Sequence, residues 1–255
     1  MISTIKKHWF TFTELVKRDF KKKYKRTYLG VLWSLLSPLL TLLVMRLVFT
    51  RFFGRDIENY TTYIFAGNII FSFFSDATVR GMGSIMANAD IFTKVNVPKY
   101  IFVFSTEVSA LINFALTFLI FILFCIIDGV MLTPLFLLLL FPILCLIIFN
   151  AGLGFILSAL FVFFRDIQYL WGVFTQLLMY MSAIFYDVSQ FPEWIQKFFL
   201  FNPIFVYVDY FRTVVLEAAV PSLLTHALAI GYALLAFFVG AVIYKTQNHK
   251  FLYYV

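Results

Sequence analysis

The chain has 255 residues, a net charge of +7, 62% hydrophobic residues and only 13% charged residues. Average soluble domains carry about 25% charged residues, so the composition excludes an ordinary soluble domain and indicates a membrane protein with several spans. Nine of the 20 Lys and Arg fall within residues 1–30. Because cytoplasmic segments of membrane proteins are rich in these residues, no nucleic-acid partner is needed to explain them.

The N-terminal segment 1–29 combines this dense positive charge with a periodic apolar pattern. Its larger apolar side chains recur at steps of four, three, four and four residues: Ile5, Trp9, Phe12, Val16 and Phe20. The spacing predicts a helix with one apolar face that lies on the cytoplasmic leaflet. A plain topological anchor is the alternative. No cleavage pattern of a signal peptide follows the first apolar run, so we expect that run to be retained as a span.

The apolar runs that follow predict six spans and an all-α integral membrane fold. The spans are expected at 30–50, 61–82, 101–127, 134–163, 168–186 and 222–244. The chain 1–255 is then a single transmembrane domain. It is made of the interface helix 1–29, spans one to five within 30–186, an extracytoplasmic segment 187–221, and a last span with a cytoplasmic tail in 222–255.

The segment 187–221 is broken by Pro192, by Asn202-Pro203 and by Pro221. Its pieces, Ile195–Phe201 and Ile204–Leu216, are too short to cross a bilayer as helices. Such pieces suit re-entrant or interfacial helices, because protein or water must satisfy their backbone groups.

The topology follows from the distribution of basic residues. With a cytoplasmic N-terminus, the inside segments carry 14 Lys and Arg, the nine of the N-terminal segment together with Lys94, Lys99, Arg165, Lys245 and Lys250. The outside segments carry four, which are Arg51, Arg55, Lys197 and Arg212. This asymmetry predicts that both termini are cytoplasmic.

The second inside loop, 84–100, contains "ANADIFTKVNVPKYIF". An Asp or Asn there is expected to cap a short helix that Pro98 ends before the third span begins. A short exposed helix between two spans is a candidate docking element for a soluble partner, and an ordinary connecting loop is the alternative.

Four ionisable residues fall inside predicted spans, where they are costly and often functional: Arg46, Asp76, Arg80 and Glu107. Asp76 and Arg80 are four residues apart, so they share a helical face and are expected to pair. The alternative is that they line a hydrophilic pathway. Glu107 either faces the cytoplasmic interface or pairs with a basic residue of the N-terminal helix.

Aromatic residues gather near the predicted outer end. Rings with polar tips suit carbohydrate, because sugar C–H faces stack on them while hydroxyls take hydrogen bonds. Packing between helices and the usual interfacial belt are the alternatives. The residues concerned are Tyr180, Phe185, Tyr186, Tyr207 and Tyr210.

Several signatures are absent from the sequence. No G-x-x-x-x-G-K-[ST], H-E-x-x-H or G-x-S-x-G motif occurs, so no nucleotide, catalytic or metal site is expected in this chain. If ATP drives a process here, the ATPase must be another chain. Cys125 and Cys145 lie in apolar runs, so no disulfide is expected.

Four stretches in order resemble the type-2 ABC transporter permeases that export polysaccharides or polyol phosphates. The first is "KRDFKKKYKRTYLGVLWSLLSPLL", which matches through Arg18, Asp19, Tyr24, Leu29, Gly30, Trp33, Leu36 and Pro38. The others are "DIFTKVNVPKYIF", then "FFRDI" at Phe164, Arg165, Asp166 and Ile167, then "FNPIFVYVDYFR". The chain departs from the family pattern at Ala183, where a proline is common.

The resemblance implies a homodimer in the bacterial plasma membrane, associated with two ABC ATP-binding subunits that carry ATP and Mg²⁺. The chain itself is then a permease and not an enzyme, and it holds no cofactor. The implied substrate is a polymer such as O-antigen, capsule or teichoic acid on an undecaprenyl pyrophosphate lipid.

The resemblance also gives expected roles to three groups of residues, and it makes 187–221 a gate at the outer mouth. Coupling to the ATPase is expected at Asp90, Phe92, Thr93, Lys94, Pro98, Lys99, Arg165 and Asp166. The interface helix and the entrance for the lipid pyrophosphate are expected at Arg18, Lys21, Lys22, Lys25, Arg26, Gly30 and Trp33. The translocation pathway is expected at Asp76, Arg80, Tyr180, Phe185, Tyr186, Tyr207 and Tyr210.

Three other functions stay open. An ABC permease for a small lipid or drug would have the same fold. A membrane enzyme acting on isoprenoid lipids would need an acid/base or metal constellation that the sequence does not show. A channel would conduct without ATP.

Overall fold

The computed structural model describes residues 2–24, 27–53, 57, 59–95 and 97–254, and its regular structure in these residues is helical. The helices in chain order are α1 (Ile2–Tyr24), η1 (Gly30–Leu32), α2 (Trp33–Phe53), α3 (Tyr60–Gly83), η2 (Met86–Asn88), α4 (Ala89–Phe92), α5 (Tyr100–Ile127), η3 (Pro134–Leu139), α6 (Leu140–Phe163), α7 (Ile167–Met181), η4 (Val188–Gln190), α8 (Glu193–Phe199), α9 (Pro203–Val215), α10 (Leu223–Gln247) and η5 (Lys250–Tyr253). The expected all-α fold is confirmed.

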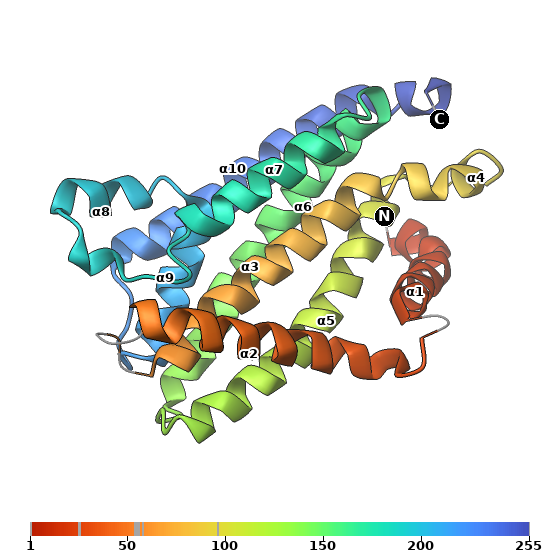
Figure 1. Ribbon diagram of the computed structural model, residues 1–255. Coiled ribbons are helices and arrows are strands. Elements are labelled where there is room, and N and C mark those ends of the chain that lie inside the picture. The colour runs from red at the N-terminus through yellow and green to blue at the C-terminus, as the bar shows by residue number, and fades with distance from the viewer. Residues whose placement is uncertain (1, 25–26, 54–56, 58, 96, 255) are drawn as a thin grey trace.

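Helix α3 is the centre of the bundle. It packs against α5, α6 and α9, and most of its side chains are buried, from Tyr60 to Met82. In Figure 1 α3, α6, α7 and α10 run roughly side by side, and α2 crosses α3 and α5. Aromatic pairs such as Phe73–Phe114 and Phe65–Phe121 fill the space between α3 and α5.

Helices α6 and α10 lie in close contact along their length. Gly152 of α6 faces Gly240 of α10, and a Cβ atom at either position would collide with the backbone of the other helix. Small residues at such a crossing let two backbones approach closely, which is a common way to pack helices in a membrane.

Three helices are long and apolar enough to cross a membrane among the described residues: Tyr100–Ile127, Pro134–Phe163 and Leu223–Gln247. The pair α8 and α9 is bent by 106° and counts as a fourth span if the two helices are taken together. The predicted number of six spans is therefore not confirmed. Helix α7 ends at Met181, earlier than the predicted 186, and Ala183 then takes a positive φ of 51° in the turn that follows.

The prediction of two short helices in 187–221 is confirmed by α8 and α9. Helix α8 ends at Phe199, and Asn202 caps the start of α9: its Oδ1 accepts a hydrogen bond from the N–H of Ile204 at 3.0 Å. Its Nδ2 donates to the carbonyl of Met181 at 3.1 Å, and Pro203 fits the first helical position, where no N–H is needed. The pair is thereby tied to the end of α7.

Both termini lie at the same end of the bundle (Figure 1). A second apolar cluster holds this end together and joins side chains that are distant in sequence, including Leu15, Phe92, Phe102, Phe155 and Phe251. We call this end, formed by α1, the segment 84–99, the α6–α7 turn and η5, the terminal end.

Candidate functional site

Helix α1 lies along α5 at the terminal end. Leu15 is buried in the second apolar cluster, and Phe12 packs partly buried against the same cluster. Trp9 keeps 60% of its surface exposed. The predicted helix is confirmed. The face that packs on the bundle includes Phe12 and Val16 of the predicted stripe together with Leu15, which lies beside it, while Trp9 of the stripe stays exposed.

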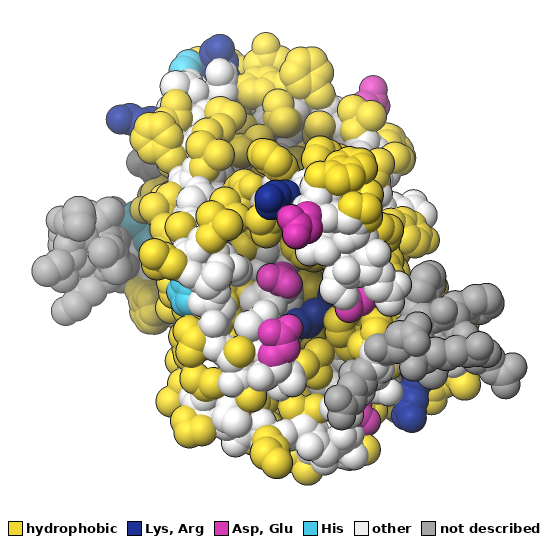
Figure 2. All heavy atoms as spheres, turned by 90° about the vertical axis from the view of Figure 1, so that its left-hand side faces the viewer, with side chains coloured by type: hydrophobic (Ala, Val, Ile, Leu, Met, Phe, Trp, Pro, Cys, Tyr) yellow, Lys and Arg dark blue, Asp and Glu magenta, His cyan; other side chains and the backbone are white. Residues whose placement is uncertain are grey.

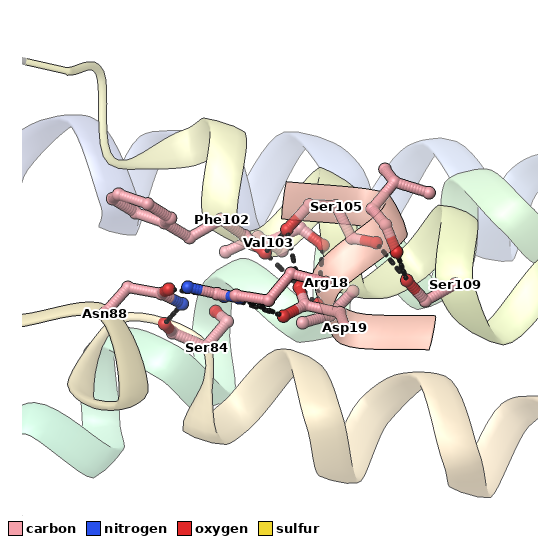
Figure 3. Close-up of polar contacts among 10 residues, drawn as sticks. Arg18, Asp19, Ser84, Asn88, Phe102, Val103, Ser105 and Ser109 are labelled. Carbon is pink, nitrogen blue, oxygen red and sulfur yellow. Dashed lines mark hydrogen bonds and ion pairs between the residues drawn. The ribbon is translucent and has the colours of Figure 1, made fainter. Parts of the chain in front are cut away.

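Arg18 joins α1 to the segment that follows α3 (Figure 3). Its Nη2 donates to Asn88 Oδ1 at 2.6 Å and forms an ion pair with Asp19 Oδ1 at 2.6 Å. The hydroxyl of Ser105 on α5 lies 3.2 Å from Asp19 Oδ2. The Arg18–Asp19 pair thus connects α1 both to the segment after α3, through Arg18, and to α5, through Asp19.

Asn88 is positioned for this contact by its own backbone environment. Its Nδ2 donates to the carbonyl of Ser84 at 2.7 Å, and the hydroxyl of Ser84 donates to the carbonyl of Gly81 at 2.7 Å. These bonds close the end of α3 and leave Asn88 Oδ1 to receive Arg18. The expected capping of a short helix by Asp or Asn is wrong for Asn88, since it makes no side-chain cap at α4.

Lys99 forms a second link at the terminal end. Its Nζ donates to the carbonyl of Asn248 at 2.7 Å and lies 5.4 Å from the ring centre of Phe92 and 5.5 Å from that of Phe251. Partial burial lowers the pKa of Lys99 from its ordinary value, because desolvation disfavours the charged form. The contacts to two rings and a carbonyl connect the segment 84–99 to the C-terminal η5.

Several residues between these two links are exposed, whereas Phe92 and Val97 are buried. Asp90, Thr93 and Lys94 point to the surface, and Val95 is 55% exposed. Figure 1 shows α4 projecting at the terminal end of the bundle. The predicted short helix is present as Ala89–Phe92, and α5 begins at Tyr100, two residues after Pro98.

The α6–α7 turn lies at the same end. Phe163 contacts the rings of Phe251 and Tyr254. Arg165 lies over the ring of Phe161 at 5.4 Å, and both Arg165 and Asp166 are exposed. The structure therefore brings all the expected coupling residues to one end of the molecule.

The corner between α1 and α2 holds the expected entrance residues. Gly30 has a positive φ of 51°, and no atom lies within 4 Å of where its Cβ would be. Trp33 and Lys21 are exposed. Lys25 and Arg26 lie outside the described residues, as does the side chain of Lys22.

Asp76 and Arg80 form the predicted pair, with Arg80 Nε 2.7 Å from Asp76 Oδ1. Asp76 lines a groove of about 420 Å³ between α2, α3 and α5, which has both polar and apolar side chains in its wall and which we call the α2–α3–α5 groove. Its wall carries Ser34, Ser37 and Thr41 of α2, Asn68, Ser72 and Asp76 of α3, and Asn113 and Thr117 of α5. Arg80 lines an adjoining groove of about 350 Å³ together with Arg18 and Asn88.

The aromatic residues expected on the pathway do not share one surface. Tyr207 and Tyr210 are fully buried, and their hydroxyls bond to the carbonyl of Ala229 and to His226. Phe185 is buried and stacks on Phe49 at 4.4 Å. Tyr186 is partly buried, while Tyr180 is 54% exposed. Packing between helices, the alternative given for these rings, describes Phe185, Tyr207 and Tyr210.

Arg212, which the sequence places in the predicted extracytoplasmic segment 187–221, is buried. Its Nη1 donates to Tyr63 Oη at 2.9 Å and to the carbonyl of Ala183 at 2.8 Å, and its Nη2 donates to the carbonyl of Ile184 at 2.9 Å. Asp187 and Asp209 lie near enough to act on its charge. Figure 2 views the molecule from the end where α8 and α9 lie, opposite the terminal end. Acidic and basic side chains are grouped near the centre of this view.

The contacts of two residues with α1 were not predicted from the sequence, those of Ser105 and Asn88. Ser105 belongs to a polar series on α5 with Ser109 and Asn113, at steps of four residues, and this periodicity could have indicated the contact with α1. Asn88 carried no such signal, because its partner lies 70 residues away in the chain. Glu107 takes part in no ion pair among the described residues: it is 4% exposed and lies beside Asn150 of α6.

Comparison with known proteins identifies the family of this chain. Residues 11–216 match the model of the ABC-2 type transporter family. The chain is 32% identical over 177 residues to the O-antigen export system permease protein RfbA of Myxococcus xanthus, covering 69% of this chain and 67% of the relative. It is 28% identical over 193 residues to the protein of the same name from Klebsiella pneumoniae, covering 74% of each.

The polysialic acid transport protein KpsM of Escherichia coli is 24% identical over 249 residues, which is 95% of each chain. The family match spans α1 from residue 11, the Arg18 contacts, the segment 84–99 and the bent pair. With its apolar helices and this match, the chain is an integral membrane protein that belongs to the ABC-2 type transporter family.

Proposed function

We propose that this chain is the transmembrane subunit of an ATP-driven exporter, which moves a lipid-linked polysaccharide or teichoic acid-type polymer across the bacterial plasma membrane. The observation that carries the proposal is the family match over residues 11–216, together with relatives whose names describe export of O-antigen and polysialic acid. The chain contributes no ATPase site and works with a separate ATP-binding subunit that holds ATP and Mg²⁺.

The exporter is proposed to contain two copies of this chain and two ATP-binding subunits. Both termini are assigned to the cytoplasm, which is supported by the excess of basic residues in the predicted inside segments and by the common end of the two termini. The ATP-binding subunit docks on the exposed residues of the terminal end, Asp90, Thr93, Lys94, Arg165 and Asp166.

Movement of the ATP-binding subunit is transmitted to the membrane helices through the two links of the segment 84–99, which are the Arg18–Asn88 contact and the Lys99 contacts. The Arg18–Asn88 contact passes a displacement of this segment to α1, and the Lys99 contacts pass it to the C-terminal η5. Because α1 lies on α5 and joins α2 at Gly30, a shift of α1 moves the helices that border the α2–α3–α5 groove.

The basic residues of α1 and of the corner after it attract the diphosphate of the substrate lipid. Lys21 is exposed and therefore accessible to the diphosphate. Arg18 is bound to Asp19 and Asn88, so its role is to connect α1 to the segment 84–99. The bent pair α8 and α9 gates the opposite end.

Deletion of the gene tests the proposal. Cells without the chain are expected to lose their surface glycan and to accumulate the lipid-linked polymer inside, and the intact gene is expected to restore export. The chain is also expected to co-purify with an ATP-binding subunit.

Polymer export would be contradicted if the surface glycan persists after deletion and the cells instead lose efflux of a small lipid or drug. Activity of the purified chain on a lipid-linked sugar without ATP would support the membrane-enzyme alternative.

A further inference from the structure

Glu107 of α5 and Asn150 of α6 form a polar pair inside the bundle. Glu107 is 4% exposed and Asn150 is fully buried, and Asn150 is the neighbouring side chain that offers Glu107 a hydrogen-bonding group. Three of their polar atoms have no hydrogen-bond partner among the described residues: Glu107 Oε1, Asn150 Nδ2 and Asn150 Oδ1. Buried polar atoms are rarely left unpaired, so these three point to a small ligand that they share.

The packing of α5 against α6 places the two side chains opposite each other. One turn away, a Cβ on Gly154 of α6 would lie 2.9 Å from Val103 Cγ1 of α5. From that contact to the polar pair, α5 advances by four residues and α6 goes back by four, as expected for one face of each of two antiparallel helices. The backbone therefore holds Glu107 against Asn150.

An ionised carboxylate is disfavoured at this position. Asp76 of α3 acts on Glu107 as a like charge, and the cation of the same helix, Arg80, is bound to Asp76 at 2.7 Å. Helix α6 carries no charged residue, and Glu107 makes no ion pair among the described residues. A carboxyl buried at membrane depth without a cation is costly as an anion, so such a group takes up a proton instead.

Protonation gives all three unpaired atoms a partner. A protonated carboxyl has one O–H donor and one carbonyl acceptor, and the amide of an asparagine also has both kinds of group. Placed face to face, an O–H on Glu107 Oε2 donates to Asn150 Oδ1, while Glu107 Oε1 accepts from Asn150 Nδ2. An ionised carboxylate only accepts, so it would leave Asn150 Oδ1 unpaired.

We propose that Glu107 and Asn150 form a proton-binding site between α5 and α6, in which the carboxyl stays protonated near neutral pH and is joined to the amide by two hydrogen bonds. The ligand is a single proton, taken from water. It connects the two helices one turn from the contact of Gly154 with Val103. The site depends on the packing of these helices and not on the identity of the transported substrate.

Infrared difference spectra of the full chain in lipid nanodiscs test the proton. The wild-type spectrum minus that of Glu107→Gln is expected to contain the C=O stretching band of a protonated carboxylic acid near neutral pH. Glu14→Gln is the matched control, because Glu14 is exposed and ion-paired with Lys17 at 2.8 Å, and it should remove carboxylate bands only. If Glu107→Gln also removes only carboxylate bands, Glu107 is ionised and the proposal is overturned.

Asn150→Leu tests the partner of the carboxyl. Leucine has a similar size but no hydrogen-bonding group, so the acid C=O loses the amide N–H and its band should move to higher frequency. Ser158→Ala is the control on the same helix, because its hydroxyl donates to the carbonyl of Phe155, and it should leave the band in place. An acid band that Asn150→Leu does not move would overturn the pairing, and this comparison with wild type does not need the glutamine variant.

Thermal midpoints of the chain in detergent give an independent measure. Glu107→Leu and Asn150→Leu should each lower the midpoint, because each leaves the other side chain buried and unpaired, whereas the double variant should melt above both single variants. Glu107→Gln should stay close to wild type, because its amide offers the same donor and acceptor. Additive losses in the double variant would overturn the proposal.

Discussion

At the scale of single residues, Arg18 joins segments that no local rule brings together. Its guanidinium reaches Asp19 of its own helix and Asn88 beyond α3 at the same time. A lysine could reach one of them, but its single ammonium lacks the planar, forked geometry that serves both. We therefore treat Arg18 as a positioning residue for coupling.

Replacing Arg18 by Met is expected to reduce export several-fold while the amount of chain in the membrane stays the same. Losing the contact is expected to lower the free energy of unfolding by about 1 kcal/mol. The value is small because the Arg18 side chain is 42% exposed, so that solvent screens its charge. ATP hydrolysis should continue in the isolated complex, so the ratio of glycan exported to ATP hydrolysed is the quantity to measure.

Lys17→Met is the matched control, since Lys17 is exposed and pairs with Glu14 within α1. It should leave the ratio unchanged. If Asn88→Ala and Arg18→Met prove additive in the double variant, the two side chains do not act through a common contact.

Arg212 is a buried cation that connects two separate segments of the chain. It holds the turn at Ala183 and Ile184 against Tyr63 of α3, and the guanidinium lies 3.5 Å from the centre of the Tyr63 ring. A Cβ on Gly67 would lie 2.9 Å from Arg212 Nη2, so glycine leaves the space that the guanidinium needs.

Arg212→Met is expected to lower the free energy of unfolding by about 3 kcal/mol, since two buried carbonyls and a hydroxyl lose their donor. The thermal midpoint of the chain in detergent is the measurement. Lys197→Met on the exposed helix α8 should not shift it. An unchanged midpoint for Arg212→Met would mean that water replaces the guanidinium at no cost.

At the scale of elements, the corner between α1 and α2 depends on backbone conformation. Gly30 has a positive φ, which costs a residue with a Cβ about 1–2 kcal/mol. No atom would meet that Cβ, so conformation and not space decides which residues are tolerated.

Gly30→Val is expected to reduce export, whereas Gly30→Asn should retain most of it, because Asn adopts the left-handed region more readily than a β-branched residue. Export per molecule of chain in the membrane is the measurement. Equal loss in both variants would show that bulk at the corner matters more than its backbone angle.

The crossing of α6 and α10 depends on space instead. Gly240→Ala is expected to destabilise the chain by about 1–3 kcal/mol, as overpacking does, because the added methyl group meets the backbone of Gly152. Gly231→Ala on the same helix has nothing within 4 Å and should be neutral or slightly stabilising. Thermal midpoints in detergent compare the two, and equal values would contradict the close crossing.

At the scale of the whole molecule, periodicity and breakers in the sequence predicted much of the fold. Long apolar runs gave α5, α6 and α10, and Asn202-Pro203 predicted the break between α8 and α9. The Asp76–Arg80 pair followed from a spacing of four. All of these depend on residues that are close in the chain.

Features that depend on distant residues could not be predicted in this way. The burial of Arg212 depends on Tyr63 and Ala183, which are distant in the chain and bind its guanidinium. The rings of Tyr207 and Tyr210 looked suited to a pathway, but tertiary packing buries them. The face of α1 that contacts the bundle includes Leu15, which the apolar stripe alone did not select.

The central claim is that this chain moves a lipid-linked glycan when its ATP-binding partner hydrolyses ATP. The direct measurement is transfer of the lipid-linked glycan across vesicles that contain the purified complex. The account predicts transfer that requires ATP, Mg²⁺, the ATP-binding subunit and this chain together. Two results would contradict this claim. One is transfer at the same rate without ATP, and the other is ATP hydrolysis by the intact complex without transfer of the lipid-linked glycan isolated from the source cells.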